Sequence, residues 1–358
     1  MLPTKDGVSP SCMALPQGPW ATLLDFLAER TPAVSRDTWQ DRMQAGEVIN
    51  AQGQPVPPDA PYQAHTKLYY WRHQPFEHVV PFEESIVFQD DHLLVADKPH
   101  FLPITPTGRH VQQTLLVRLK KRLGIDTLVP MHRIDRETAG LVAFTLRPSE
   151  RSAYQNLFRD RAVRKVYEAV APLLSHTRPE LSLPLLYRSR LVESEHFMVM
   201  QEVSGEPNAE TLIELIASHH CQRPHPHPHP HPNQQAPLGL YRLSPITGRK
   251  HQLRAQLNAL GMPIVNDQIY PTLMPEPPLG EPPNFSQPLQ LLARSLHFTD
   301  PITGVERSFH SQMLLDWPPD GQGAQAHGPI AAGLPLSADD FVISRDLTGD
   351  AAATLTLG

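Results

Sequence analysis

The chain has 358 residues and a net charge of −6, and 40% of its residues are apolar. That length leaves room for about two domains, and the apolar fraction excludes a wholly disordered chain. No run approaches the roughly 18 apolar residues of a membrane span, and the first residues lack the pattern of a secretory signal. We therefore expect a cytoplasmic protein with no membrane partner. Cys12 and Cys221 are too few and too far apart for a disulfide framework.

The net charge conceals two regions of opposite sign. Residues 109–168 carry 13 Lys and Arg against 6 Asp and Glu, whereas residues 271–358 carry 3 basic and 10 acidic residues. Because only the local field acts on a polyanion that approaches one face, residues 109–168 are a candidate nucleic-acid surface. The same cations could equally decorate solvated helix faces, and their number alone does not decide between the two.

Residues 1–79 are expected to form a small accessory module. An apolar cluster at 23–27 predicts a first helix, and Ser35 is suited to cap a second one that ends at Gly46. Trp39 and Met43 lie four residues apart and would share a face of the second helix. The pattern alone assigns no task to this module.

Residues 80–318 are expected to form an α+β domain with a mixed, largely antiparallel sheet and flanking helices. The basis is that short strands alternate irregularly with single helices, and no Gly-rich phosphate loop is present. Helices are predicted at 114–124, after a cap at Ser149, near 209–217, and at 250–260. Strands are predicted at 86–88, 93–96, 141–146, 163–171, 239–244 and within 289–301.

Two segments carry no regular period. The His-Pro tract centred on 225–232 cannot form a helix or a ladder, because alternate residues lack a backbone donor, and it predicts a surface insertion at 219–236. Its histidines suggest a metal-handling protein as one interpretation. An extended tract lacks the fixed geometry of a dedicated site, however, and no metal centre is predicted. Residues 319–358 are expected to be a mobile tail.

The segment HRIDRETAGL, residues 132–141, places Asp135 in a tight polar turn before an apolar strand. A lone Asp in a turn commonly caps the backbone. The alternative is a catalytic group, since the guanidinium groups of Arg133 and Arg136 would keep a partly buried carboxylate ionised, as a nucleophile or a base requires. The residues alone leave both interpretations open.

The segment ITGRKHQLRAQL, residues 246–257, brings Arg249 and Arg254 to the start of a predicted helix. A helix N-terminus with two such cations can anchor a phosphate or a carboxylate, although a capped helix with exposed arginines is the simpler interpretation. Leu253 and Leu257 would face the core. Tyr167, on the predicted strand RKVYEAV, fits either a core position or a base-stacking role.

Together and in this order, these segments resemble the RluA-type RNA pseudouridine synthases over residues 81–311. The resemblance rests on DDHLLVADKP, HRIDRETAGL, RKVYEAV, GEPNAET and GRKHQLRAQLNALGMPI. Several positions depart from the family pattern: Ile134, Ala139, Lys250, Ala255, Gln256, Met262 and Asn266. The departures leave the Asp, Tyr and Arg positions intact, and they concern substrate preference and the packing of the site.

The resemblance implies a pseudouridine synthase fold and the isomerisation of specific uridines in ribosomal or transfer RNA. It identifies Asp135 as the catalytic aspartate and Tyr167 as the aromatic residue that packs against the target uracil. It further implies substrate-binding roles for Arg133, Arg249, Leu253 and Arg254. Either Arg249 or Arg254 is then the basic partner of the aspartate. The region from Ser35 onward is similar to the small S4-like RNA-binding module of some relatives.

The expected chemistry breaks the C1′–N1 bond of uridine and forms a C1′–C5 bond. Because no electrons or external groups are exchanged, neither a nucleotide cofactor nor a metal is expected, and RNA is the expected partner, without an obligate protein partner. An alternative of another class is a non-catalytic RNA-binding or ribosome-assembly protein on the same fold. The isolated aspartate disfavours it, because a module that only binds a polyanion has no need of a carboxylate facing it.

Overall fold

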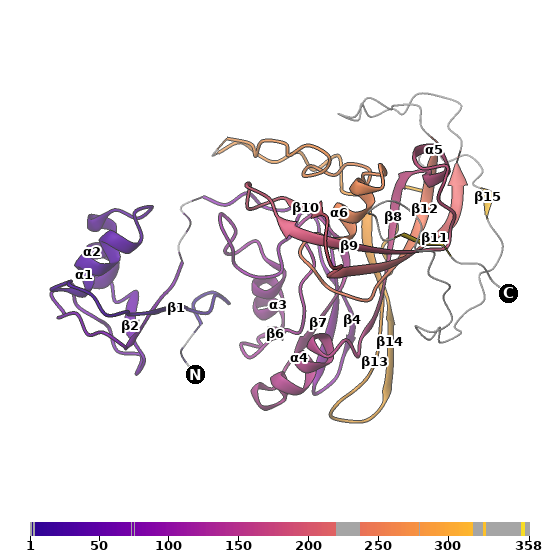
Figure 1. The fold of residues 1–358 in the computed structure, drawn as a ribbon. Helices are drawn as coiled ribbons and strands as arrows, with labels where there is room; N and C mark the ends of the chain where they lie inside the picture. Colours follow the sequence, from indigo (N-terminus) through magenta and orange to yellow (C-terminus); the bar gives the residue numbers. More distant parts are fainter. Residues whose placement is uncertain are drawn as a thin grey trace. The chain divides into compact units, whose positions relative to one another are not determined.

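The computed structural model describes residues 4–219 except 73 and 75, residues 237–317 except 279, residue 2, and two short strands (Figure 1). The predicted His-Pro insertion lies outside the described residues except for His219, and the predicted tail lies outside them except for the two short strands, 325–326 and 352–354. The chain forms two compact units, Met1–Val79 with Thr105–Asp126 and Val80–Ile104 with Thr127–Gly358.

The first unit contains a three-stranded antiparallel sheet in the order β1-β3-β2. Thr22 caps α1 reciprocally: its hydroxyl accepts from the Asp25 N–H, and the Asp25 carboxylate accepts from the Thr22 N–H. Ser35 caps α2 as predicted, and Trp39 and Met43 are buried in one core with α1. The elements are β1 (Ser11–Ala14), α1 (Leu23–Arg30), α2 (Arg36–Gln44), β2 (Val48–Asn50), β3 (Lys67–Tyr70) and α3 (Leu115–Leu123).

The helix predicted at 114–124 is confirmed as α3. The Thr114 hydroxyl caps its first turn, and Gly124 ends it in the left-handed conformation with φ of 69°. Val117 packs with Val8 and Val111, so α3 belongs to the first unit, whereas the sequence placed it in the main body. The basic region at 109–168 is therefore divided between the two units. The expectation of an S4-like module stays a prediction.

The second unit is built on one thirteen-stranded sheet. Its central path runs β10-β9-β11-β12-β8-β13-β7-β5-β4, with β14 on β13, β6 on β7, β15 on β11 and β16 on β9. Among the described strands, β7 and β13 form the one parallel pair, and every other pairing is antiparallel. This confirms the predicted α+β class with a mixed, largely antiparallel sheet.

The bounds of this unit's elements follow the predicted strands closely at 86–88, 93–96, 141–146, 163–171 and 239–244. The first strands are β4 (Ser85–Gln89), β5 (Leu93–Lys98), β6 (Val129–Pro130), β7 (Ala139–Thr145), β8 (Arg164–Pro172) and β9 (Leu185–Glu193). The others are β10 (Met200–Val203), β11 (Ala209–His219), β12 (Leu238–Pro245), β13 (Leu291–Thr299), β14 (Glu306–His310), β15 (Gln325–Ala326) and β16 (Ala352–Thr354). The helices are α4 (Arg151–Arg159), α5 (Leu174–Thr177) and α6 (Gln252–Ala259), with a 3-10 turn at Pro148–Glu150.

Two predictions in this unit are wrong. The segment 209–217 is not a helix but strand β11, because it pairs on both edges with β9 and β12 and its residues are buried with a period of two at first. Ser149 does not cap a helix; it lies in the 3-10 turn, and α4 begins at Arg151 without a side-chain cap. At 209–217 the pairing with β9 and β12 outweighs a local propensity for helix. The helix predicted after Ser149 is present as α4, and only its cap differs.

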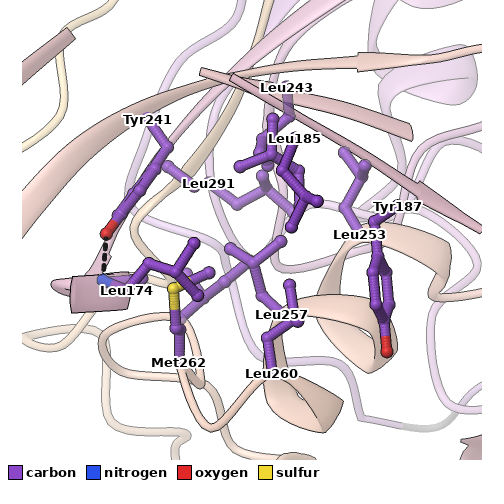
Figure 2. Close-up of a cluster of buried hydrophobic side chains, with 14 of the residues drawn as sticks. Leu174, Leu185, Tyr187, Tyr241, Leu243, Leu253, Leu257, Leu260, Met262 and Leu291 are labelled. Atoms are coloured by element: carbon purple, nitrogen blue, oxygen red, sulfur yellow. Dashed lines mark hydrogen bonds between the residues drawn. The ribbon is translucent and has the colours of Figure 1, made fainter. Parts of the chain in front are cut away.

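The apolar stripe of α6 packs against the sheet (Figure 2). Leu253, Leu257 and Leu260 lie in one buried cluster with side chains of β9, β12 and β13. Each leucine contributes about 1.5–3 kcal/mol when fully buried, and together they fix the rotation of the helix about its axis. The Tyr241 hydroxyl accepts from the Leu174 N–H at 2.9 Å in the same cluster. The neighbouring face of α6, which carries Arg254, is therefore held toward the loop that carries Asp135.

Gly140 allows β7 and β13 to approach closely just after that loop. Its φ is 108°, and a Cβ at this position would lie 2.3 Å from the backbone oxygen of Ala293. Only glycine adopts this conformation without strain and leaves room for the neighbouring backbone. The parallel pairing of Gly140 with Ala293 thus fixes the point at which the Asp135 loop runs into β7.

Candidate active site

An open cleft of about 730 Å³ lies in the second unit. Its walls come from the loop before β7, from the connection between α4 and β8, and from the turn that leads into α6. All the predicted site residues line it, namely Arg133, Asp135, Tyr167, Arg249, Leu253 and Arg254. The fold thus brings together three segments that are far apart in the sequence.

Asp135 is held by a buried arginine from α6. Arg254 Nη1 donates to Asp135 Oδ2 at 3.0 Å; the aspartate side chain is 27% exposed and the arginine side chain only 1%. His251 Nε2 lies 3.8 Å from the other carboxylate oxygen. Burial lowers the pKa of His251, although the charge of Asp135 opposes the shift, so this imidazole is neutral at neutral pH. The carboxylate is thus oriented from one side and open to the cleft on the other.

Arg254 is fixed in turn by the buried carboxylate of Asp267. Arg254 Nε and Nη2 donate to its two oxygens at 2.8 and 2.7 Å, a bidentate arrangement. Glu137 Oε2 lies 3.7 Å from Arg254 Nη1. Burial would lower the pKa of Arg254, but the hydrogen bonds and charge of Asp267, with Asp135 and Glu137, raise it above its ordinary value. The guanidinium stays charged and in place.

The loop around Asp135 is tied down by two further buried charges. Lys98 is fully buried and donates to the backbone oxygens of Pro99 and Arg136 at 2.9 and 3.0 Å. Burial lowers the pKa of Lys98 to about 7. Burial alone would raise the pKa of Glu137, but the neighbouring Arg136 and Arg254 outweigh it and hold this pKa at about 2. These contacts position the loop and leave Asp135 as the carboxylate that faces the cleft.

The choice that the sequence left open between two arginines is decided by geometry. Arg254 bonds Asp135, whereas Arg249 is exposed and its Nε donates to the Asn208 backbone oxygen at 3.1 Å. Gln252 holds the intervening turn, because its Oε1 accepts from the Arg249 N–H and the Thr247 hydroxyl. Arg249 therefore lies on the wall of the cleft rather than beside the aspartate.

Apolar groups form the floor of the cleft beside Asp135. Tyr167 on β8 is partly buried and packs against the same cluster as Leu253 and Leu291, all of which line the cleft. Burial, with a smaller contribution from the charge of Asp135, raises the pKa of the Tyr167 phenol, so its hydroxyl stays protonated. An aromatic ring and leucine side chains next to a carboxylate are suited to a heteroaromatic ring.

Cations that sequence reasoning did not assign to the site stand around this floor. Arg161 and Lys165 line the cleft with the exposed Arg133, and none of the three forms an ion pair with a carboxylate of the described residues. The sequence feature that could have assigned Lys165 to the site is its position two residues before Tyr167, on the same face of the strand. No sequence pattern marks Arg161. The carboxylate Asp267, also missed, lies in the segment NDQIY, residues 266–270, which follows GRKHQLRAQLNALGMPI.

Comparison with known proteins identifies the family. The family model of RNA pseudouridylate synthases matches residues 92–259. An uncharacterized RNA pseudouridine synthase from Synechocystis sp. is 30% identical over 248 residues, which cover 69% of this chain and 79% of that protein. The chain belongs to the RluA-type RNA pseudouridine synthases.

Two further comparisons agree with this assignment. A dual-specificity RNA pseudouridine synthase RluA from Pasteurella multocida is 32% identical over 229 residues, or 63% of this chain and 91% of that protein. The solved structure of human RNA pseudouridylate synthase domain containing 1 has the same fold, with a TM-score of 0.50 and 20% identity over 74% of this chain and 95% of the other. The protein is thus an RNA pseudouridine synthase, an isomerase.

Two features of the described residues bear on other classes of site. Among residues 4–219 and 237–317, no group of three or more His, Cys, Asp or Glu side chains is placed to hold a metal ion. The His-Pro tract lies outside that range. No described helix is long and apolar enough to cross a membrane.

Proposed function

We propose that this synthase converts specific uridines of structured ribosomal or transfer RNA to pseudouridine with Asp135 as its single catalytic carboxylate. The observation that carries the proposal is that Asp135 is the one carboxylate among the described residues that line the cleft. It is partly exposed and hydrogen-bonded to a buried, permanently charged arginine. Hydrolysis of a glycosidic bond commonly uses two carboxylates and a water, whereas an isomerisation at C1′ needs one.

Each group of the cleft has a place in this reaction. The target nucleotide leaves its stack at a cost of a few kcal/mol, and its uracil packs on Tyr167 and Leu253. Arg254 donates a hydrogen bond to Asp135 and aims this carboxylate at the sugar–base linkage. The C1′–N1 bond breaks and its electron pair stays on N1, the uracil turns in place, and the C1′–C5 bond forms. C5 then loses its proton and N1 takes one up, so that the product is an isomer of the substrate. Attack on C1′, addition to the base and removal of the 2′ proton all use the same ionised carboxylate.

The cations around the cleft supply the contacts to the RNA backbone. Arg133 and Arg249 both line the cleft. In this proposal Arg133 takes the position of the displaced base, and Arg249 contacts a phosphate. The names of the relatives support the substrate class: one is a dual-specificity RNA pseudouridine synthase, and a yeast relative, 32% identical over 191 residues, is a tRNA pseudouridine(31) synthase. The proposed isomerisation exchanges neither electrons nor external groups, so it needs no redox or group-carrying cofactor.

Mapping of pseudouridines in total RNA from cells that lack the protein tests this proposal. We expect one or a few uridines in ribosomal or transfer RNA to lose their modification and to regain it when the wild-type gene is restored. An unchanged map, with the purified wild-type protein inactive on the same RNA, would favour the alternative of a non-catalytic RNA-binding protein on this fold.

A further inference from the structure

The hairpin that joins β9 to β10 carries an exposed aromatic side chain. Phe197 is 69% exposed, whereas its neighbours Met198 and Val199 pack inward against a buried cluster that contains Tyr270. The Met200 N–H donates to the Tyr270 hydroxyl at 2.8 Å. The strand after the tip is therefore anchored on the same tyrosine that lies against Arg254, with 5.7 Å between the guanidinium carbon and the ring centroid.

Backbone hydrogen bonds close the tip of this hairpin. The Ser194 N–H donates to the Val199 oxygen at 3.0 Å, and the Val199 N–H donates to the His196 oxygen at 2.8 Å. The His196 N–H donates to the Ser194 hydroxyl at 3.2 Å. The rings of His196 and Phe197 are nearly parallel, with an interplanar angle of 16° and centroids 5.5 Å apart. The exposed ring thus stands on an ordered turn.

Lys250 connects this tip to the cleft. Its Nζ donates to the Phe197 backbone oxygen, lies 5.9 Å from the centre of the Phe197 ring, and is 3.5 Å from Glu193. Its chain neighbours Arg249 and His251 both line the cleft. Lys250 is also one of the positions at which this chain departs from the family pattern. The aromatic tip therefore stands beside Lys250, whose two chain neighbours line the cleft.

We propose that Phe197, supported by Lys250, is a stacking platform for an unpaired base that flanks the target uridine in the same RNA. A single exposed apolar residue has no special meaning by itself. An exposed ring beside cations, on the edge of a cleft that takes an extruded nucleotide, has the composition of single-strand RNA sites, where bases stack on aromatic rings and cations follow the phosphates. Extruding the target removes the stacking partner of its neighbours, and the Phe197 face replaces that partner.

This inference rests on the proposed RNA substrate, and its test uses a probe that does not require the natural substrate. The probe is a fluorescein-labelled oligouridylate of about a dozen nucleotides, with an abasic oligomer of equal length as the phosphate-only counterpart. We expect Phe197→Ala to raise the Kd of the oligouridylate roughly 5- to 150-fold, the range for loss of one stacked base. Phe197→Trp should restore the wild-type Kd or lower it.

The matched control is Ile302→Ala, which removes a 40% exposed apolar side chain elsewhere in the same unit. It should leave the Kd unchanged, and Phe197→Ala should not alter the weaker binding of the abasic oligomer. Equal affinity of Phe197→Ala and wild type for the oligouridylate would overturn the proposal, and so would an equal loss for both oligomers. Equal oligouridylate binding by Phe197→Ala and wild type, with normal uridine modification by the wild type, would overturn this inference and leave the proposed function standing. A surface that binds a protein instead would show no base dependence at all.

Discussion

The inner end of the cleft and its rim differ in how their charges are balanced. At the inner end, Arg254 is shared by Asp135, Asp267 and Glu137, with two hydrogen bonds to the buried Asp267 and one to the partly exposed Asp135. At the rim, Arg161 and Lys165 line the same cleft without a carboxylate partner among the described residues. One set of charges is compensated within the protein, and the other is left for a ligand.

This difference separates two tasks. A compensated and buried network has a fixed geometry, and a fixed geometry is what a reacting carboxylate requires. Cations without an internal partner cost less to bring to a phosphate, because no ion pair must be broken first. Replacing residues of the inner network should therefore abolish turnover and lower the free energy of unfolding. Replacing cations of the rim should instead weaken RNA binding and reduce the dependence of this binding on salt.

The largest effect is expected for Arg254→Met. It leaves the buried Asp267 carboxylate without its partner, which costs about 3–5 kcal/mol of unfolding free energy, and it frees Asp135 to turn away. Pseudouridine formation should be lost, as measured with the mapped RNA, and urea denaturation should show the loss of stability. Arg254→Lys keeps the charge but not the bidentate geometry. Its activity and stability should therefore fall between those of the wild type and those of Arg254→Met.

Arg36→Met is the control for a paired but exposed arginine. Arg36 bonds Asp25 at 2.7 Å with 52% of its side chain exposed, and such pairs contribute about 1 kcal/mol or less. A loss of stability for Arg254→Met no larger than for Arg36→Met would show that the inner network is not a structural unit.

A smaller effect is expected at the rim. Arg161→Gln and Lys165→Gln should each weaken RNA binding by about 1 kcal/mol, roughly fivefold, and each should reduce the slope of log Kd against log salt by about one phosphate contact. Arg159→Gln is the matched control, because Arg159 lines the same cleft but already bonds Asp160 at 2.8 Å. Equal losses for Arg159→Gln and Arg161→Gln would remove the distinction between paired and unpaired cations.

Much of this site could be predicted from the sequence because its parts are local. The Asp135 turn, the Tyr167 strand and the apolar stripe of α6 each lie within about ten residues, and the structure has each of them. Their order along the chain was enough to identify the family. The choice between Arg249 and Arg254 could not be made, because it depends on the rotation of α6 that Leu253, Leu257 and Leu260 fix against the sheet.

The errors arise where distant partners decide the local structure. Residues 209–217 contain Ala, Glu and Leu, which favour a helix, yet pairing with β9 and β12 makes them a strand. Helix α3 was predicted correctly, but its packing with Val8 was not visible in its own pattern. Arg161 and Asp267 reach the site through turns between elements, and no periodicity marks such positions.

The central claim is that Asp135 performs the chemistry and does not contribute to RNA affinity. Purified Asp135→Asn, titrated with the RNA that carries the mapped uridine and then assayed for pseudouridine, tests it most directly. We expect affinity equal to or tighter than that of the wild type, since one negative charge facing a polyanion is removed, and no product. Product formation at the wild-type rate would contradict the account.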